Sequence, residues 1–456
     1  LRVKVETILR HDGELTYHKL LGDHRFEKSE SNLPLRHGTF VVDIVRVSDV
    51  PNVQQAEQLA TAANRWRQLQ QPTLSLKGLW DHGTEPCALD RTRVASTICD
   101  LPERPSAPVS ETCRDRREYG RGARQRFYQR ELENEATTDP EFAKILAHLQ
   151  FTDNLKQLSE RPNSPNSDED DDSKLSDNVV DKLAIFYVDG NKFGQKGREI
   201  FGTHGADGFR EWSQALRRHH QSLLKGLLKM ADQSPERWKN GDEIRLETLL
   251  WGGDEILWVV PAWLGWDVAR WFFSQPHQVQ VQDHTFDLTY GCGLVFCHMK
   301  APIKNTSALA HRLGDAAKQA RPGEHSLAYE VLESFDDISG DLDEHRRRFL
   351  PVGECLSSLV IDPTVLQSHW STLTGLTTCS DFPMRQLYML CSAWRKSASY
   401  DVDNAHAMRL RAACRSAGVD IDSVIDAFGD PVAWLHLLQM LPYLPTGDAQ
   451  TAEGQP

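Results

Sequence analysis

The sequence lacks the features that mark membrane-spanning, secreted and disulfide-bonded proteins. Its longest apolar runs are far shorter than the roughly 20 residues that a membrane-spanning helix needs. No signal-peptide pattern opens it, and none of its nine cysteines belongs to a C-x-x-C pair. These absences argue against a membrane protein and against a disulfide framework, and they predict a protein of the reducing cytoplasm.

Positive charge is also scarce. The chain has 52 Lys and Arg against 65 Asp and Glu, a formal net charge of -13, which disfavours binding of duplex nucleic acid by the whole surface. Nucleic acid would therefore need a local basic face. One candidate is the stretch 114–130, in which seven arginines are interleaved with Tyr119, Phe127 and Tyr128. Arginine with aromatic rings suits phosphate binding and base stacking, whereas pairing with the protein's own acids is the alternative.

The length and the composition divide the chain into regions. A chain of 456 residues exceeds the size at which one core stops growing, so we expect two or three domains. A stretch rich in Ser, Pro, Asn and acid predicts a disordered linker at 159–180. It separates an N-terminal α/β module, 1–158, from a mixed region at 181–335. Helical periodicity predicts a helical domain at 336–446, and small polar residues predict a disordered tail at 447–456.

The region 181–335 has the pattern of an α+β fold. A buried-type strand, Leu183–Val188, is followed by a helix and by a hairpin with strands Ile244–Trp251 and Ile256–Val260. A second helix, a strand at Phe286–Cys297, an Ala-rich helix and a last strand complete the region. This βαββαβ order predicts a ferredoxin-like sheet with antiparallel pairing at the hairpin.

Three acids fall at the strand ends of this region. Asp189 directly follows the first strand, and Asp254 and Glu255 lie in the hairpin turn after Gly252 and Gly253. Carboxylates gathered at one sheet edge can hold Mg²⁺ or Mn²⁺, which neutralise the charge that develops in nucleotidyl transfer. We expect the two glycines to adopt positive φ angles and to let a nucleotide approach the backbone. Ordinary turn chemistry is the alternative for this tetrapeptide.

A second group of residues is suited to phosphates. The glycine-spaced turn that begins at Gly190 could cradle a triphosphate with its amides, helped by Lys192 or Lys196. Lys318 lies on the Ala-rich helix and could direct its ammonium towards phosphates, with a solvated helix face as the alternative. The residues predicted to bind nucleotide are Gly190, Asn191, Lys192, Phe193, Gly194, Gly252, Gly253 and Lys318.

Four motifs together resemble a known family. The segments 186–194, 250–255, 293–303 and 316–318 are similar, in that order, to the CRISPR polymerase palm. This is the catalytic palm of the large subunit of type III CRISPR effector complexes, a relative of GGDEF diguanylate cyclases and class III nucleotide cyclases. The resemblance covers about a third of the chain.

The resemblance implies a ferredoxin-like palm that uses ATP and magnesium. Its expected product is a cyclic oligoadenylate, or a related cyclic nucleotide, that acts as a second messenger in antiviral defence. Asp189, Asp254 and Glu255 match the metal-binding acids, and Lys318 matches a lysine that faces the triphosphate. Guide or target RNA and CRISPR effector subunits are the implied partners. A homodimer stays open, because the acceptor nucleotide could be held by the N-terminal module or by a second subunit.

The chain departs from the family at several positions. The hairpin ends in Glu255 where the family usually has a second aspartate, and Asn191 stands where the first loop often has an aspartate. Ile256 occupies the position of an aromatic in diguanylate cyclases, which favours the CRISPR-type palm over a cyclic-di-GMP enzyme. His11-Asp12 is the only His-Asp pair near the start and lacks a set of further ligands, so we predict no HD nuclease.

The N-terminal module is less defined by its sequence. An apolar strand at Thr39–Val47, followed by helical spacing at Ala56–Leu69, leaves a degenerate second palm open. A zinc set like that of the family's zinc-binding insertion would be His82, Cys87, Cys99 and Cys113. Because no C-x-x-C pair is present, we interpret these cysteines as structural.

Three hypotheses about function follow. The first is a magnesium-dependent nucleotidyltransferase that converts ATP to a cyclic adenylate. The second is a catalytically idle palm that serves as a structural or RNA-binding subunit of a guide-RNA complex. The third is a standalone cyclic-dinucleotide synthase. Loss of a metal ligand would favour the second hypothesis, and all three acids are present.

Overall fold

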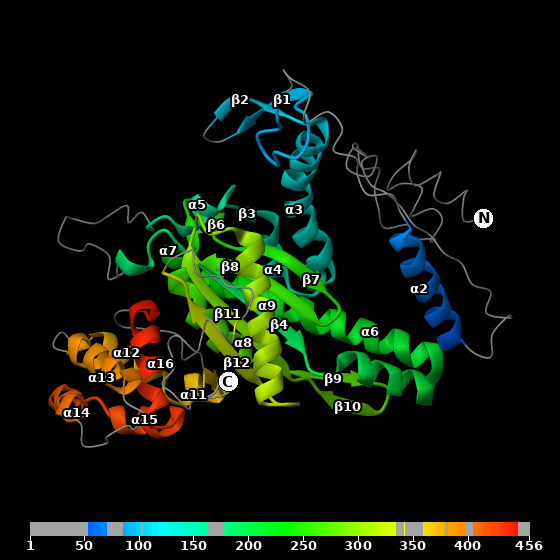
Figure 1. Cartoon of the computed structure of the whole chain (residues 1–456). Coiled ribbons are helices and arrows are strands. Elements are labelled where there is room, and N and C mark those ends of the chain that lie inside the picture. The colour runs from blue at the N-terminus through cyan, green and yellow to red at the C-terminus, as the bar shows by residue number, and fades with distance from the viewer. Residues whose placement is uncertain are drawn as a thin grey trace. The chain divides into compact units, whose positions relative to one another are not determined.

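The structure, a computed structural model, describes residues 53–70, 85–101, 104–162, 177–333, 359–378, 382–396 and 405–445, together with Leu342. The chain divides into two compact units, Leu1–Tyr128 and Gln129–Pro456 (Figure 1). In the part of the chain that is described, no helix is long and apolar enough to cross a membrane. The expected strand Thr39–Val47, the His11-Asp12 pair, His82 and the predicted tail lie outside the described residues.

The first unit contains helices and a small antiparallel hairpin. Helix α2, Val53–Leu69, agrees with the helical spacing of the sequence there. Strands β1, Thr97–Leu101, and β2, Arg104–Val109, pair antiparallel. Helix α3, Glu111–Thr138, begins in this unit and carries the arginine-rich stretch. Arg114 on this helix lies 2.9 Å from the carboxylate of Asp115, so acid pairing accounts for at least one of these arginines.

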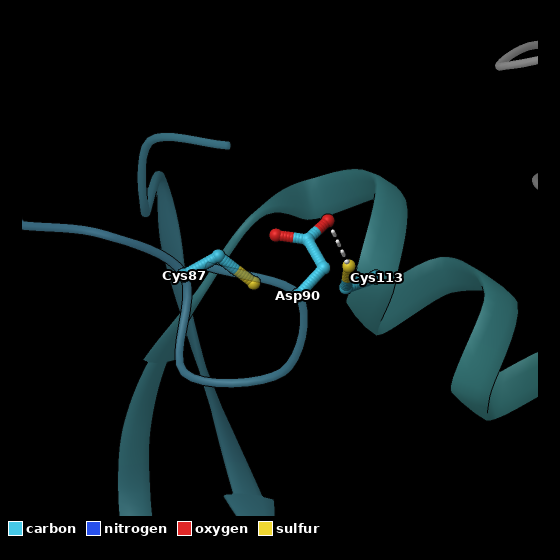
Figure 2. Close-up of side chains that lie close together, drawn as sticks. All are labelled: Cys87, Asp90 and Cys113. Atoms are coloured by element: carbon cyan, nitrogen blue, oxygen red, sulfur yellow. Dashed lines mark hydrogen bonds between the residues drawn. The ribbon is translucent and has the colours of Figure 1, made fainter. Parts of the chain in front are cut away.

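Two of the four candidate zinc ligands come together in the first unit, beside a carboxylate. Ligand atoms of Cys87, Asp90 and Cys113 all lie within 4.8 Å of one another, and the Cys113 thiol lies 3.1 Å from an Asp90 oxygen (Figure 2). Asp90 also pairs with Arg93. Cys99 is outside this group, and its thiol lies 3.7 Å from the Asp100 carbonyl oxygen. The group would supply three metal ligands, one fewer than a structural zinc site has. The structural role of these cysteines stays a prediction.

The second unit is built on a six-stranded sheet with the order β13-β12-β11-β4-β8-β7. Every neighbouring pair is antiparallel except β11 with β12. The α+β class predicted from the sequence is therefore confirmed. The strands are β4 (Lys182–Gly190), β7 (Glu247–Gly252), β8 (Glu255–Pro261), β11 (Tyr290–His298), β12 (Ser326–Val331) and β13 (Val360–Ile361). Smaller strands are β3 (Gln150–Phe151), β5 (Lys239–Asn240), β6 (Glu243–Ile244), β9 (Gln278–Val281) and β10 (His284–Asp287).

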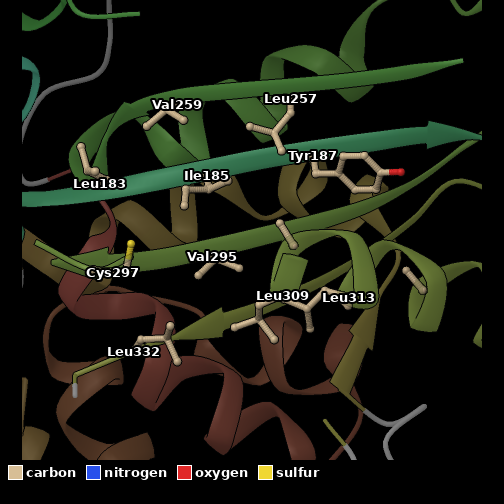
Figure 3. Packing of buried hydrophobic residues seen from close by; sticks show 14 of the residues in the cluster. Leu183, Ile185, Tyr187, Leu257, Val259, Val295, Cys297, Leu309, Leu313 and Leu332 are labelled. Carbon is tan, nitrogen blue, oxygen red and sulfur yellow. The ribbon is translucent and has the colours of Figure 1, made fainter. Parts of the chain in front are cut away.

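Helices bury both faces of the central strands. Helix α9, Ile303–Ala320, covers the face that carries Ile185 and Val259, and together these residues form one core cluster (Figure 3). On the opposite face, Phe186 of β4 contacts the ring of Phe272 on helix α8, Gly265–Ser274. Burial on two sides explains why β4 is a continuous apolar run rather than an alternating one.

The other helices of the second unit lie before the sheet, between its strands or after it. Helix α6, Phe193–Gln233, follows β4 and is kinked at Gly205, whose backbone angles are not helical. The short helices before the sheet or beside it are α4 (Pro140–Ala147), α5 (Leu155–Ser159) and α7 (Pro235–Trp238). The described part of the predicted helical domain contains α11 (Pro363–Ser368), α12 (Trp370–Thr378), α13 (Met384–Lys396), α14 (Ala405–Ser416), α15 (Ile421–Phe428) and α16 (Val432–Met440). Its strand β13 joins the sheet, which the sequence did not indicate.

A cluster of buried histidines surrounds Tyr290, the first residue of β11. His219 and His277 lie 3.3 Å apart between ring nitrogens, and His220 lies 3.4 Å from the Tyr290 hydroxyl. Burial lowers the pKa of His219 and of His220 to about 4 and that of His277 to about 3. These imidazoles are therefore neutral in the folded protein at neutral pH, whereas they take up protons near pH 6.5 when unfolded.

We expect the second unit to lose stability in acid because of this cluster. The folded pKa values lie below the unfolded value, so the stabilisation is complete above about pH 6.5 and is lost as the pH falls towards 4. The loss is on the order of 3 kcal/mol for one such histidine. The free energy of unfolding, measured in urea at several pH values between 7.5 and 5, should therefore fall steeply with pH in the wild type and less steeply in His220→Phe. His148→Gln, which changes an exposed histidine, is the control. An equal pH dependence in His220→Phe and in the control would contradict the expectation.

Candidate active site

The structure places the three predicted acids at one edge of the central sheet. Asp189 of β4 lies directly opposite Glu255 of β8 in the strand register. The Gly190 amide donates to the Asp254 carbonyl at 2.9 Å, which ties the end of β4 to the hairpin turn. Antiparallel pairing of β7 with β8 brings Gly252 opposite Glu255, with only Gly253 and Asp254 in the turn. Residues 65 positions apart in the sequence therefore meet because two strands end at the same place.

The acids are partly removed from water. Burial raises the pKa of Asp189 and of Asp254 above their usual values, and the neighbouring carboxylates raise both further. Lys318 opposes this effect on Asp189 through its ammonium, which contacts the carboxylate. Crowded carboxylates with little water bind cations favourably, because a cation relieves both their repulsion and their poor solvation.

Two of the three acids interact with other side chains of the protein. The Lys318 ammonium pairs with Asp189 and lies 3.2 Å from the Gly190 carbonyl oxygen. The Tyr187 hydroxyl donates to Glu255 at 2.8 Å, and its ring lies 3.8 Å from the imidazole of His311, centre to centre. The sequence singled out Lys318 for the triphosphate, but its contact with Asp189 is a finding of the structure.

The donor set suits a hard divalent cation. It consists of carboxylate oxygens from Asp189, Asp254 and Glu255, with the Gly190 carbonyl beside them, and magnesium and manganese prefer such oxygens. Among the residues that the structure describes, these three carboxylates do not form a group with one oxygen each all within 4.8 Å of one another. A shared ion would therefore require some of these side chains to change position.

The hairpin glycines have a different role from the one expected. Neither Gly252 nor Gly253 has a positive φ angle, so the expectation of left-handed backbone at the turn is wrong. A Cβ atom at either position would meet no atom within 4 Å. The two glycines instead leave open space beside Asp254, and a close approach of nucleotide to this backbone stays a prediction.

The predicted phosphate loop is shorter than the glycine spacing indicated. Helix α6 begins at Phe193, so Gly194 lies in its first turn, and Lys192 before it has a left-handed φ of 59°. The first amides of a helix lack intrahelical acceptors and attract anions. The candidate hydrogen-bond donors to phosphate are therefore amides at the start of a helix, and not amides of an extended glycine turn.

Three residues of this loop have clear structural roles. A Cβ atom at Gly190 would lie 2.6 Å from the Phe193 ring, so a larger residue would displace that ring. Phe193 is buried against Trp212 and Tyr290. The buried Asn191 amide donates to the Glu324 carbonyl at 2.8 Å and to the Thr289 hydroxyl at 3.1 Å. Asn191 thus holds neighbouring loops together, and its predicted nucleotide contact is not tested.

Sequence reasoning missed the residues that bring Lys318 to Asp189. Gly291 and Gly293 of β11 face helix α9, where a Cβ at Gly291 would collide with the Lys318 side chain and one at Gly293 with the Ala310 carbonyl oxygen. Gly314 of α9 lies against Tyr187, and a Cβ atom at Gly314 would lie 3.0 Å from the Tyr187 ring. The helix can approach the strand only because these side chains are absent. The G-x-G spacing within a strand was the signal that could have identified this contact.

Solved structures resemble this chain, although no family model and no curated protein matches it. One is Csm1 in the crystal structure of the Csm1-Csm4 cassette in complex with cA4, with 14% identity and a TM-score of 0.39, covering 59% of this chain and 37% of that one. Csm1 of T. onnurineus has 14% identity and a TM-score of 0.36, with 63% and 40% covered. The GGDEF domain of FimX from Pseudomonas aeruginosa has 15% identity and a TM-score of 0.23, with 33% and 81% covered.

These structures are of the two kinds that the sequence motifs resemble. The chain spans 37% and 40% of the length of the two Csm1 chains. With TM-scores below 0.5, none of the three carries an argument about function, which rests on the residues of this chain.

Proposed function

We propose that this protein is a nucleotidyltransferase that uses magnesium or manganese to convert ATP to a cyclic oligoadenylate second messenger in CRISPR-type antiviral defence. The register of Asp189 opposite Glu255, with Asp254 in the adjoining turn, carries the proposal. It gives one sheet edge three carboxylates, a half-buried lysine and open space for a substrate.

The sheet supports a palm of ferredoxin type as the catalytic domain. Strands β11-β4-β8-β7 are antiparallel neighbours, and along the chain they follow the order β4, α6, β7, β8, α8, β11. Leaving aside the small elements α7, β5, β6, β9 and β10, this succession agrees with the proposed βαββαβ palm, with the first strand between two neighbours and its end at the acids. The remaining strands, β12 and β13, extend the sheet on the side away from the hairpin.

Each residue of the site has a distinct part in the proposed reaction. Asp189, Asp254 and Glu255 would hold the metal ions, and the first amides of α6 and Lys318 would hold the triphosphate. When bound, such ions would supply neutralisation of charge on the α-phosphate and a lower pKa for the attacking ribose hydroxyl. Gly252 and Gly253 leave room for the nucleotide at the turn. The acceptor nucleotide requires a second site, from the N-terminal module or from a second copy of the chain.

An idle palm in a guide-RNA complex is the second candidate. The arginine-rich stretch of α3, with Arg126 5.7 Å from the centre of the Tyr119 ring, favours contact with RNA in either case. A standalone cyclic-dinucleotide synthase would use the same acids without RNA. Dependence on RNA separates these alternatives from one another.

The proposal is tested by the products that the purified full-length chain makes. The protein is incubated with each ribonucleoside triphosphate and Mg²⁺ or Mn²⁺, with and without target RNA, and products are resolved by mass. We expect pyrophosphate and cyclic adenylates from ATP. A requirement for RNA would favour the effector-complex role, whereas products without RNA would favour the standalone synthase. If no triphosphate yields pyrophosphate or a cyclic product under any condition, the enzyme proposal is wrong.

A further inference from the structure

The Lys318 ammonium lies at oxygens that a divalent cation would otherwise take. It contacts the Asp189 carboxylate and lies 3.2 Å from the Gly190 carbonyl oxygen. A carboxylate and an adjacent backbone carbonyl are the kinds of oxygen that hard divalent cations bind. A metal ion that binds Asp189 Oδ2 and the Gly190 carbonyl oxygen must therefore compete with the ammonium for these atoms.

The separation of the three acids agrees with this competition. Asp189 is turned to Lys318 and Glu255 accepts from Tyr187, so the two carboxylates are held by different partners. In the described part of the chain, their oxygens and that of Asp254 do not form a set within 4.8 Å. The acids can share a metal ion through the Asp189 Oδ2 atom only after Lys318 leaves that oxygen.

Lys318 needs another anion when it leaves. Its side chain is 21% exposed and that of Asp189 is 18% exposed, so neither charge is well solvated. The close packing of α9 on Gly291 and Gly293 also limits how far the lysine stem can move. A metal ion would neutralise the carboxylates of the site, and Asp315, one helical turn before Lys318, is exposed to water. A triphosphate bound beside the metal would offer the ammonium a new anion.

We propose that Lys318 is a resident counter-ion of Asp189 that couples the binding of metal to the binding of triphosphate. Metal alone binds weakly, because it must displace the ammonium without offering it a new partner. Metal with triphosphate binds strongly, because the phosphates accept the displaced ammonium. This inference rests on the proposed function, since it takes metal and triphosphate to meet at this sheet edge.

Binding of Mn²⁺ alone to the full-length protein tests the counter-ion role. The free ion is followed by electron paramagnetic resonance, without any nucleotide. Lys318→Met should bind Mn²⁺ about 5- to 150-fold more tightly than the wild type, the usual range of coupling between sites. Lys304→Met, which removes an exposed lysine from the start of the same helix, should bind it as the wild type does. In Asp189→Asn/Lys318→Met the gain should disappear, because the ion loses its carboxylate.

Two results would overturn the proposal. One is a folded Lys318→Met variant that binds Mn²⁺ no more tightly than the wild type, and the other is a gain that survives Asp189→Asn. If Lys318→Met does not fold, Lys318→Gln replaces it, because glutamine keeps a hydrogen-bond donor for Asp189 but has no charge. Lys318→Arg keeps the charge and should show no gain.

The Mn²⁺ measurement is independent of turnover. A protein that makes no pyrophosphate but shows the expected Mn²⁺ pattern would refute the proposed function and leave the counter-ion role intact. A protein that makes a cyclic product but shows no gain in Mn²⁺ affinity in Lys318→Met would support the proposed function and refute the counter-ion role.

Discussion

Replacing Asp189 with asparagine should reduce the release of pyrophosphate from ATP by at least about a hundredfold. Asparagine has the size of aspartate and can still accept a hydrogen bond from Lys318, so the end of β4 should keep its structure. It cannot supply the negative charge that holds a divalent cation. The loss should therefore appear in the rate of turnover of the folded variant, measured by coupled pyrophosphate detection with saturating ATP and Mn²⁺.

A carboxylate outside the site provides the control for this variant. Asp283 is exposed in the turn between β9 and β10, within the same unit of the chain. Asp283→Asn makes the same chemical change and should keep the wild-type rate. Comparable rates for Asp189→Asn and Asp283→Asn would show that Asp189 has no part in the reaction.

The position of the acids could be predicted because it depends on local structure. A strand of apolar residues ends at Asp189, and a two-residue turn presents Asp254 next to Glu255. Both features are set by short segments whose patterns are visible in the sequence. Antiparallel pairing of β4 with β8 then brings the two strand ends together.

The partners of the acids could not be predicted, because they depend on how a helix packs on the sheet. Lys318 reaches Asp189 only where α9 approaches β11 through Gly291 and Gly293. Tyr187 precedes Asp189 by two residues and so lies on the same face of β4, but nothing in the sequence says that it donates to Glu255. Contacts of this kind depend on packing distances rather than on residue patterns.

Two elements were predicted with the wrong extent for related reasons. The strand expected at Phe286–Cys297 is two strands, β10 and β11, because β10 turns away to pair with β9. The glycine-spaced turn after Asp189 is mostly the first turn of α6, in which a Cβ at Gly197 would lie 3.2 Å from the rings of Phe209 and Trp212. Glycine there serves tight packing within the helix, which a sequence cannot distinguish from a loop signal.

Arg245 is a buried cation that the sequence gave no reason to notice. It is 0% exposed, and its guanidinium donates to the Gln157, Leu158 and Glu160 carbonyls at 2.8 to 2.9 Å and to the Lys239 carbonyl at 3.1 Å. Burial lowers its pKa to about 10, so it stays charged at neutral pH. One side chain thus satisfies the end of helix α5 and the backbone of β5, and it is stabilised by carbonyl dipoles rather than by a bonded carboxylate.

Arg245→Met should lower the free energy of unfolding by about 3–5 kcal/mol, because four buried or partly buried carbonyls lose a charged donor that methionine cannot replace. Arg245→Lys should recover only part of this loss, since an ammonium has three donors and no planar geometry to reach all four oxygens. Arg210→Met, which removes a 66% exposed partner of Asp207, should change stability by less than about 0.5 kcal/mol. Urea unfolding gives the free energies of unfolding of the three variants and so ranks their stabilities. An Arg245→Met variant as stable as Arg210→Met would mean that water or neighbouring backbone replaces the guanidinium.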